Sequence, residues 1–252
     1  MRPDLIRDLF EKEATYWWNV SKREMVHSLL RNIGSIQGLK ESGLAIDIGC
    51  GSGYTARVFE SYYRTVAVDV SKEALQLCRR RGLSRLCQVD MASFTLPFKT
   101  NSFDLVLALD IIEHVENDVH ALMECRRILR DGGLMIVTVP AFMALWSPWD
   151  EALGHRRRYN ASAMAETINK AGLSVKKLTY MFFFVFPMAV FIRRVKRLLQ
   201  RDATNYSSDF IPIPKVVNDL LILIGRLEQL LIARLGLRLP FGLSVISVIT
   251  KK

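Results

Sequence analysis

Short apolar runs alternate with segments of helical spacing through the middle of this chain, and this alternation constrains its fold more than any other feature. Runs that are apolar on both faces are typical of parallel sheets, which helices cover on both sides. The sequence therefore predicts an α/β fold built on a doubly wound, mostly parallel sheet. The runs expected to form strands are 44–48, 65–69, 86–90, 103–110 and 134–140.

Signals for helix ends support this alternation of strands and helices. A first helix is expected at about 52–61, directly after a glycine-rich turn. Ser71 fits the N-cap of a second helix, and Gly82 fits the residue just after its last turn. Asp118 can cap a third helix, which is expected to end at 131–133.

The net charge of +10 is concentrated in the C-terminal third of the chain. Residues 1–175 hold 22 basic and 21 acidic side chains, a balance of +1, whereas residues 176–252 hold 13 and 4, a balance of +9. A positive field confined to one part of the chain favours an anionic partner there, either a membrane surface or a nucleic acid.

Two further features indicate a compartment. The four cysteines show no C-x-x-C spacing, so we expect free thiols in a reducing environment. The first eighteen residues lack the uncharged core of a signal peptide. We therefore expect a cytoplasmic protein.

Three glycines follow the first expected strand and indicate where a cofactor binds. Gly49, Gly51 and Gly53 let the backbone turn sharply and approach a ligand without a Cβ atom in the way. A dinucleotide-binding turn would need a glycine where Tyr54 stands. Asp47 would repel a pyrophosphate but can meet the cationic amino-acid end of S-adenosylmethionine (SAM). These details favour SAM over a nicotinamide or flavin cofactor.

Aspartates end three further strands of the expected sheet, at positions 69, 90 and 110. The carboxyl ends of parallel strands meet at one edge of a sheet, where ligands bind. One such aspartate would often be a turn residue, but three in register with a glycine loop favour a binding site. Asp69 is placed to accept hydrogen bonds from two ribose hydroxyls.

Five motifs in order resemble those of class I SAM-dependent methyltransferases. In spacing they are most similar to the branch that contains the ubiquinone and menaquinone biosynthesis methyltransferases. The resemblance covers about residues 40–175 and implies SAM as the cofactor and S-adenosylhomocysteine as its product. The motifs are A-I-D-I-G-C-G-S-G-Y, V-A-V-D-V-S, V-D-M-A-S-F-T-L-P-F, F-D-L-V-L-A-L-D-I-I-E-H-V and R-I-L-R-D-G-G-L-M-I-V-T-V-P.

The resemblance also implies which residues contact the cofactor. Asp69 would bind the ribose, Asp90 would bind the adenine amino group and Met91 would lie against the adenine ring. The backbone from Gly49 to Gly51 would hold the methionine moiety. The complete predicted cofactor set is Asp47, Gly49, Cys50, Gly51, Gly53, Asp69, Val70, Asp90, Met91 and Asp110.

A seven-stranded sheet with an antiparallel last strand is a further implication of the resemblance. Strands six and seven would be 173–180 and 243–250, separated by a helical insertion. The aromatic run Tyr16-Trp17-Trp18 would belong to a lid over the cofactor or, alternatively, to the core of an N-terminal helix pair. The expected units are an N-terminal helical lid (1–40), a SAM-binding Rossmann-like core (41–180), an apolar and basic insertion (181–242) and the final strand (243–252).

Methyl transfer from SAM is an in-line displacement, in which a base is needed only when the acceptor must lose a proton. Asp110 and His114 follow the fourth strand, beside the expected methyl group, and His114 can accept a proton near neutral pH. The alternative is a structural role for His114. His155, oriented by Asp150, is a second candidate base. No metal is expected, because Glu113 and His114 are adjacent and no paired-histidine spacing exists.

The loop after the fifth strand is expected to bind the acceptor. It gathers aromatic, acidic, imidazole and guanidinium groups, and arginine suits the bidentate capture of phosphate or carboxylate. The alternative is a solvated loop with a run of charges. The predicted acceptor-binding residues are Trp146, Asp150, Arg157 and Tyr159.

Two apolar segments in the basic C-terminal third predict peripheral association with an anionic membrane. Segment 178–192 has fifteen uncharged residues, but Pro187 interrupts it and it is too short to span a bilayer. Segment 215–235 has a narrow polar stripe on an otherwise apolar helix. Such elements dip into the headgroup region and are held by basic flanks. They could instead cap the sheet or form a homodimer interface.

Three functions follow from these observations. The main hypothesis is a methyltransferase that acts on a hydroxyl, or less readily a carbon, of a lipophilic or lipid-linked acceptor at the membrane surface. The second is a soluble methyltransferase for a small molecule or nucleic acid, with the insertion as an oligomer interface. Nucleic acid is disfavoured, because no Pro-Pro-aromatic motif follows the fourth strand. The third is a non-catalytic SAM-binding partner subunit.

Overall fold

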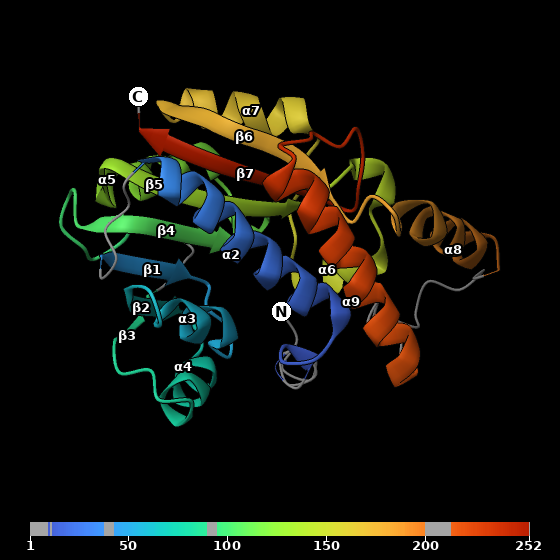
Figure 1. The fold of residues 1–252 in the computed structure, drawn as a ribbon, viewed down its shortest axis with the longest axis horizontal. Coiled ribbons are helices and arrows are strands. Elements are labelled where there is room, and N and C mark those ends of the chain that lie inside the picture. The colour runs from blue at the N-terminus through green and yellow to red at the C-terminus, as the bar shows by residue number, and fades with distance from the viewer. Residues whose placement is uncertain (1–9, 11, 38–42, 90–94, 200–212, 252) are drawn as a thin grey trace.

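A computed structural model describes residues 10, 12–37, 43–89, 95–199 and 213–251 of the chain. Its centre is one seven-stranded sheet in the order β3-β2-β1-β4-β5-β7-β6 (Figure 1). Neighbouring strands pair in parallel except β7, which runs antiparallel to both β5 and β6. The predicted fold class is confirmed. The strands are β1 (Leu44–Ile48), β2 (Arg64–Asp69), β3 (Leu86–Gln88), β4 (Phe103–Leu109), β5 (Leu129–Pro140), β6 (Leu173–Met181) and β7 (Ser244–Lys251).

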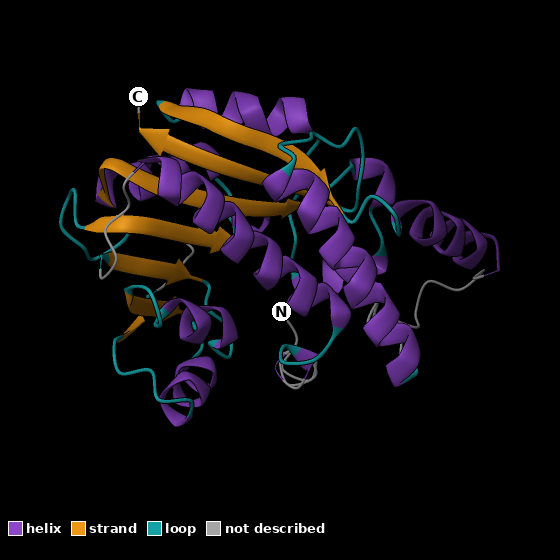
Figure 2. Cartoon of the chain, viewed as in Figure 1, coloured by secondary structure: helices purple, strands orange, loops and turns teal. Residues whose placement is uncertain are grey.

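Helices connect the parallel strands and cover both faces of the sheet (Figure 2). The α-helices are α2 (Trp17–Gln37), α3 (Tyr54–Phe59), α4 (Lys72–Arg80), α5 (Asp118–Ile128), α6 (Pro148–Leu153), α7 (Ala161–Lys170), α8 (Phe186–Leu199) and α9 (Lys215–Gln229). The described part of the chain also has the short helical turns η1 (Ile112–His114), η2 (Met143–Leu145) and η3 (Leu230–Arg234), the last of which continues α9.

The helix ends follow local side-chain chemistry. Ser71 caps α4 by accepting a hydrogen bond from the backbone of Ala74, and Gly82 follows the last turn at φ +86°, both as predicted. The cap predicted at Asp118 is wrong by one residue, because the Asn117 side chain accepts from the His120 amide.

The third helix is also shorter than expected. It ends at Ile128, and β5 begins at once with Leu129, so the turn expected at 131–133 is an irregularity within the strand. The pairing between β4 and β5 shifts register there, from Phe103 opposite Leu129 to Leu105 opposite Leu134. A register shift of this kind leaves no signal in the apolar pattern.

One face of the sheet is covered by α2 and α9, which lie side by side (Figure 1). Arg226 forms an ion pair with Glu24 at 2.8 Å, and Asn32 donates to the Ala233 carbonyl at 2.7 Å. Gly225 lies directly against Ser21, where an added Cβ would come within 2.3 Å of the serine hydroxyl. The segments predicted as separate lid and insertion thus share one helical layer with a common buried core.

The other face of the sheet is covered by α5 and α7. Their buried residues include Leu122, Cys125, Met164 and Ile168. Helix α8 projects from the molecule beyond the carboxyl ends of the parallel strands (Figure 1). Among the described residues, no helix combines the length and apolarity needed to cross a bilayer.

Candidate functional site

The candidate site lies at the carboxyl ends of β1, β2 and β4, and the glycine loop after β1 forms its floor. The amides of Gly49 and Cys50 both donate to the Val68 carbonyl at the end of β2. Gly49, Gly51 and Gly53 all have positive φ angles, of 72°, 54° and 84°. A Cβ atom on Gly53 would lie 2.6 Å from the Cys78 sulfur, so the sequence has glycine where both conformation and packing demand it.

Asp69 ends β2 and ties the glycine loop to the next helix. Its carboxylate accepts hydrogen bonds from the Gly51 amide at 3.0 Å and from the Ser71 amide at 2.9 Å. Burial raises the pKa of Asp69, although these hydrogen bonds oppose the shift. Val70, next to it, is exposed. The predicted ribose-binding role of Asp69 stays a prediction.

Asp47 lies fully within the protein beneath the glycine loop. One of its carboxylate oxygens accepts no hydrogen bond from any described residue. Burial, with the negative charges of Glu13 and Asp69 nearby, raises the pKa of Asp47 to about 7. A cationic group near this carboxylate would bind the oxygen that lacks a hydrogen bond and would stabilise the ionised form of Asp47. This agrees with the predicted contact to the amino group of SAM.

Glu13 contacts the same loop and was not found from the sequence. Its carboxylate accepts from the Ser52 amide at 3.0 Å and from the Tyr54 amide at 3.3 Å, and it also binds the Ser52 hydroxyl. Burial raises the pKa of Glu13. No spacing rule links residue 13 to a loop about forty residues later, so the sequence held no signal for this contact.

Asp110 directly follows β4 and has a left-handed conformation with φ 53°. Lys22 from α2 forms an ion pair with its carboxylate, and the Thr138 hydroxyl donates to it at 2.8 Å. Burial alone raises the pKa of Asp110, but Lys22 lowers it overall. Lys22 is a second residue that the sequence analysis missed, and it links the N-terminal helix to the strand ends.

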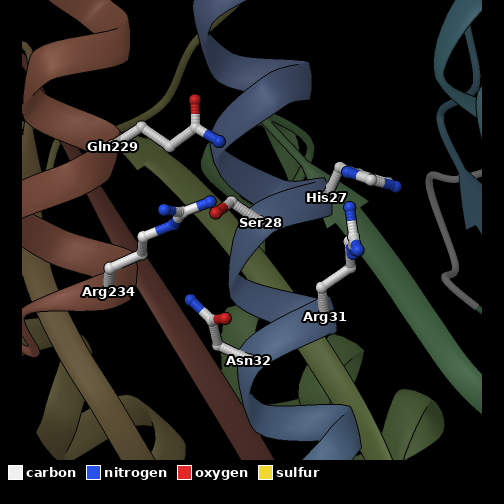
Figure 3. A pocket seen from close by; sticks show the side chains of 6 residues that line it. All are labelled: His27, Ser28, Arg31, Asn32, Gln229 and Arg234. Atoms are coloured by element: carbon white, nitrogen blue, oxygen red, sulfur yellow. The ribbon is translucent and has the colours of Figure 1, made fainter.

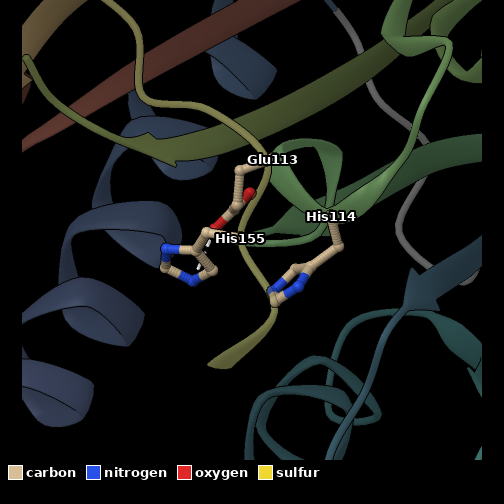
Figure 4. A group of neighbouring side chains, drawn as sticks. All are labelled: Glu113, His114 and His155. Carbon is tan, nitrogen blue, oxygen red and sulfur yellow. Dashed lines mark ion pairs between the residues drawn. The ribbon is translucent and has the colours of Figure 1, made fainter. Parts of the chain in front are cut away.

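Glu113, His114 and His155 gather beside this strand end (Figure 4). The ring centroids of the two histidines are 4.7 Å apart, nearly perpendicular to each other. His155 Nε2 lies 3.9 Å from a carboxylate oxygen of Glu113. Burial, with His155 beside it, lowers the pKa of His114 to about 4, so this imidazole is neutral at pH 7.

Asp150 is the buried centre of the loop after β5. Its carboxylate lies 2.8 Å from His155 Nδ1, and it accepts from the Arg158 guanidinium at 2.7 and 3.0 Å. Burial alone raises the pKa of Asp150, but the hydrogen bonds from His155 and Arg158 lower it overall. Asp150 therefore orients His155, the arrangement considered for a base, while its oxygens are saturated within the protein.

The other predicted acceptor-binding residues are engaged with protein groups. The buried Tyr159 hydroxyl donates to Asp118 at 2.7 Å. Arg157 pairs with Asp118 at 3.2 Å and donates to the Glu116 carbonyl at 2.7 Å. Trp146 is partly exposed and donates to Glu151 at 3.3 Å. Tyr159 and Arg157 thus attach the loop after β5 to Asp118 and the residues before it. Acceptor binding by Tyr159 and Arg157 stays a prediction.

Two predicted cofactor residues, Asp90 and Met91, lie outside the described residues. The three aromatic residues of the predicted lid behave partly as core. Trp18 stacks on Phe182 with ring centroids 4.0 Å apart, and Trp17 meets the same ring edge-on. Trp17 and Trp18 therefore pack against the segment after β6, and the lid role stays a prediction.

A surface pocket of about 260 Å³ lies over the seam of α2 with α9 and η3 (Figure 3). Polar and basic side chains line it, and none of them belongs to the predicted site. The lining residues are His27, Ser28, Arg31, Asn32, Gln229 and Arg234.

Comparisons with known proteins agree with this geometry. Residues 46–137 match the family model described as "Methyltransferase domain". The "Probable S-adenosylmethionine-dependent methyltransferase" of Mycolicibacterium smegmatis is 28% identical over 170 residues, which cover 65% of this chain and 62% of that protein.

Two other curated relatives have named roles. A "Ubiquinone biosynthesis O-methyltransferase" of Alkalilimnicola ehrlichii is 28% identical over 137 residues, covering 50% of this chain and 56% of that protein. The "Probable tRNA methyltransferase 9B" of Mus musculus is 29% identical over 164 residues, covering 60% of this chain and 35% of that protein. In each of these three relatives the match spans less than two thirds of the protein.

Among solved structures, a SAM-dependent methyltransferase from Thermotoga maritima has the same fold. Its TM-score is 0.57 at 19% identity, with 98% of each chain covered. The motifs, the strand order and the matched domain together confirm the resemblance inferred from the sequence, and with it SAM as the cofactor.

Proposed function

We propose that the whole protein methylates a hydroxyl group of a lipophilic or lipid-linked acceptor at an anionic membrane surface. This proposal starts from residues 46–137 as a class I SAM-dependent methyltransferase domain. Carbon is the less favoured acceptor atom. The domain binds the methyl donor SAM, and the C-terminal third provides the surface that contacts the acceptor.

The observation that carries this proposal is an exposed apolar stripe on α9. Its members recur at helical spacing on the side of α9 that faces away from the sheet, and each is between 41% and 79% exposed. Soluble proteins seldom expose this many large apolar side chains in one row unless they meet a partner or a membrane. The stripe consists of Val216, Leu220, Leu223 and Leu227 of α9 and continues into η3 with Leu230.

Charge favours a lipid surface as the occupant of the α9 stripe. Lys215 and Arg226 lie on the helix edge beside it, where they pair with Asp219 and Glu24, and residues 176–252 have a balance of +9. Helix α8 adds exposed Met188 and Phe191 and the basic residue Arg194. Apolar side chains that enter the headgroup boundary, held by basic side chains against anionic lipid, have this composition.

The position of these helices supports access to the site. The Arg193 side chain of α8 donates to the Leu145 carbonyl in the loop after β5. Helix α2, which packs on α9, provides Lys22 for Asp110. An acceptor held in the lipid layer beside α8 and α9 would therefore be near the strand ends where the methyl donor is expected.

Sedimentation with lipid vesicles tests the membrane part. We expect binding to vesicles with 30% anionic lipid, weak binding to neutral vesicles, and a fall of at least tenfold in binding for Leu220→Glu/Leu223→Glu. Met123→Glu is the matched control, because Met123 is 51% exposed on α5, over the opposite face of the sheet. Equal binding by the double variant and the wild type would contradict the proposal.

Transfer of labelled methyl from SAM into a fractionated cell extract tests the activity. We expect label in the lipid phase, and none after Asp69→Ala, which removes the predicted ribose contact. Label confined to the aqueous or RNA fraction would overturn the lipid acceptor and favour the soluble alternative. SAM binding without any transfer would favour a non-catalytic SAM-binding subunit.

A further inference from the structure

We infer that Glu113, His114 and His155 bind a divalent first-row transition-metal ion beside the methyl-transfer site. A ligand atom from each of these side chains lies within 4.8 Å of the other two. Glu113 and His114 come from η1 after β4, and His155 comes from the loop after β5 (Figure 4). Two imidazoles and one carboxylate form a donor set that suits Zn²⁺, Fe²⁺, Co²⁺ or Mn²⁺.

The Glu113 carboxylate independently indicates a missing ligand. Its side chain is 0% exposed, and neither carboxylate oxygen accepts a hydrogen bond from any described residue. A buried carboxyl group without hydrogen bonds is costly, and native proteins seldom leave both of its oxygens unsatisfied. A cation between Glu113 and the two histidines would remove this cost.

Both histidines are held in the form that a metal requires. His155 Nδ1 lies 2.8 Å from Asp150, and His114 Nδ1 lies 3.3 Å from the Gly154 carbonyl. Each acceptor fixes a proton on Nδ1 and leaves the lone pair on Nε2. Metal-binding histidines almost always have such a carboxylate or carbonyl partner on the other nitrogen. Asp150 and Gly154 are therefore positioning groups for the metal ligands.

The surrounding charges leave room for a cation. Lys22 pairs with Asp110, and Arg158 pairs with Asp150, so those two carboxylates have partners of their own. Burial, with the negative charge of Asp110 nearby, raises the pKa of the Glu113 carboxyl group, and a cation at the centre of the cluster would stabilise its ionised form. No metal was expected from the sequence, because Glu113 and His114 are adjacent and no sequence pattern places His155 beside them.

The metal would act on the acceptor, and only this role rests on the proposed function. An acceptor hydroxyl bound to the ion would have a lowered pKa and release its proton to water. Its oxygen would then bond to the methyl carbon of SAM as the carbon–sulfur bond breaks, leaving S-adenosylhomocysteine. With its lone pair on the metal, His155 would be a ligand and not a base.

Titration with Co²⁺, followed by visible absorption, tests the site in the full chain without a histidine tag, SAM or acceptor. We expect one Co²⁺ per chain, displaced by Zn²⁺. Glu113→Gln and His155→Ala should each weaken binding at least tenfold. His120→Ala, which changes an exposed histidine on α5, should leave it unchanged. Glu113→Gln should unfold no more readily than the wild type, because it keeps the side-chain volume and replaces a buried ionisable group with one that cannot be charged.

Two results would overturn the inference. One is no Co²⁺ binding by the wild type at millimolar metal. The other is binding that Glu113→Gln and His155→Ala leave intact but Cys50→Ser removes, which would assign the ion to the Cys50 and Cys78 thiols, 3.7 Å apart. Because no methyl transfer is measured, failure here leaves the proposed function untouched, and failure of methyl transfer leaves the metal site untouched.

Discussion

The buried carboxyl group of Asp47 couples the cofactor site to the stability of the protein. The Asp47 side chain is buried beneath the glycine loop, because its neighbours in β1 are apolar and lie in the core. Burial, together with Glu13 and Asp69, raises its pKa from 3.8 to about 7. Folding therefore holds a proton on Asp47 at pH values where the unfolded chain has released it.

This shift predicts how stability depends on pH when SAM is absent. Between pH 4 and 7 the folded state binds the additional proton, so the free energy of unfolding falls as pH rises, by up to about 4 kcal/mol. Asp47→Asn cannot titrate, so its stability relative to the wild type should increase from pH 4 to pH 8. Urea unfolding at both pH values measures the difference.

Asp131→Asn provides the control for the pH experiment. Asp131 is exposed, and its side chain lies 3.3 Å from Lys251 on the surface. Its replacement should change stability by less than about 0.5 kcal/mol at either pH. If Asp47→Asn follows the wild type across the whole range, Asp47 is ionised in the folded protein and the loop is polar enough to hold its charge.

At the scale of elements, the seam between α2 and α9 joins two helices that are about two hundred residues apart in the chain. Gly225 has no side chain at the point where α9 meets Ser21 of α2. An alanine there would favour the helix by about 1 kcal/mol if α9 were free. At the seam its Cβ would come within 2.3 Å of the Ser21 hydroxyl and 2.8 Å of the Ser21 Cβ.

A double-mutant cycle tests this contact. Gly225→Ala should destabilise the wild type, because the clash outweighs the gain in helix propensity. In a Ser21→Gly background, where the clashing atoms are absent, the same change should be neutral or stabilising. We expect a coupling free energy of at least about 1 kcal/mol from urea unfolding. Additive effects of the two changes would mean that α2 and α9 do not meet at these residues.

Elements differed in how well the sequence predicted them. The strands β1, β2 and β4 were predicted to within about one residue, because their apolar runs end at sharp polar boundaries. The start of β5 was missed by five residues, since a register shift against β4 follows from strand pairing and leaves no local pattern. The cap of α5 was misplaced because Asn117 and Asp118 both have capping side chains, and only geometry selects one.

At the scale of the whole molecule, the helical layer makes the insertion part of one folding unit. Leu221 of α9, Met25 of α2 and Leu107 of β4 belong to the same buried cluster. Segments that share a core cannot unfold separately without exposing it. The insertion and the SAM-binding domain should therefore unfold in a single cooperative transition.

Two probes of one denaturation experiment test this cooperativity. In Trp146→Phe/Trp149→Phe, fluorescence reports on Trp17 and Trp18 at the seam, and far-ultraviolet circular dichroism reports on the whole chain. We expect the two transitions to coincide. Leu221→Ala should shift both together by about 2–4 kcal/mol, whereas its exposed neighbour Leu220→Ala should shift neither by more than about 0.5 kcal/mol. Separate transitions would instead identify the insertion as an independent unit.

The sequence by itself determined the parallel sheet and the cofactor class, and the antiparallel last strand was implied by the resemblance to class I SAM-dependent methyltransferases. Strand periodicity, the glycine loop and Asp69 are local patterns, and local patterns can be recognised in the sequence alone. Only the tertiary structure decided which distant groups meet. It brought Glu13 to the glycine loop, Lys22 to Asp110, and His155 to Glu113 and His114. These contacts join residues that are far apart in the sequence and are brought together by the connections between strands. Neither composition nor spacing indicates where such a connection returns to the sheet.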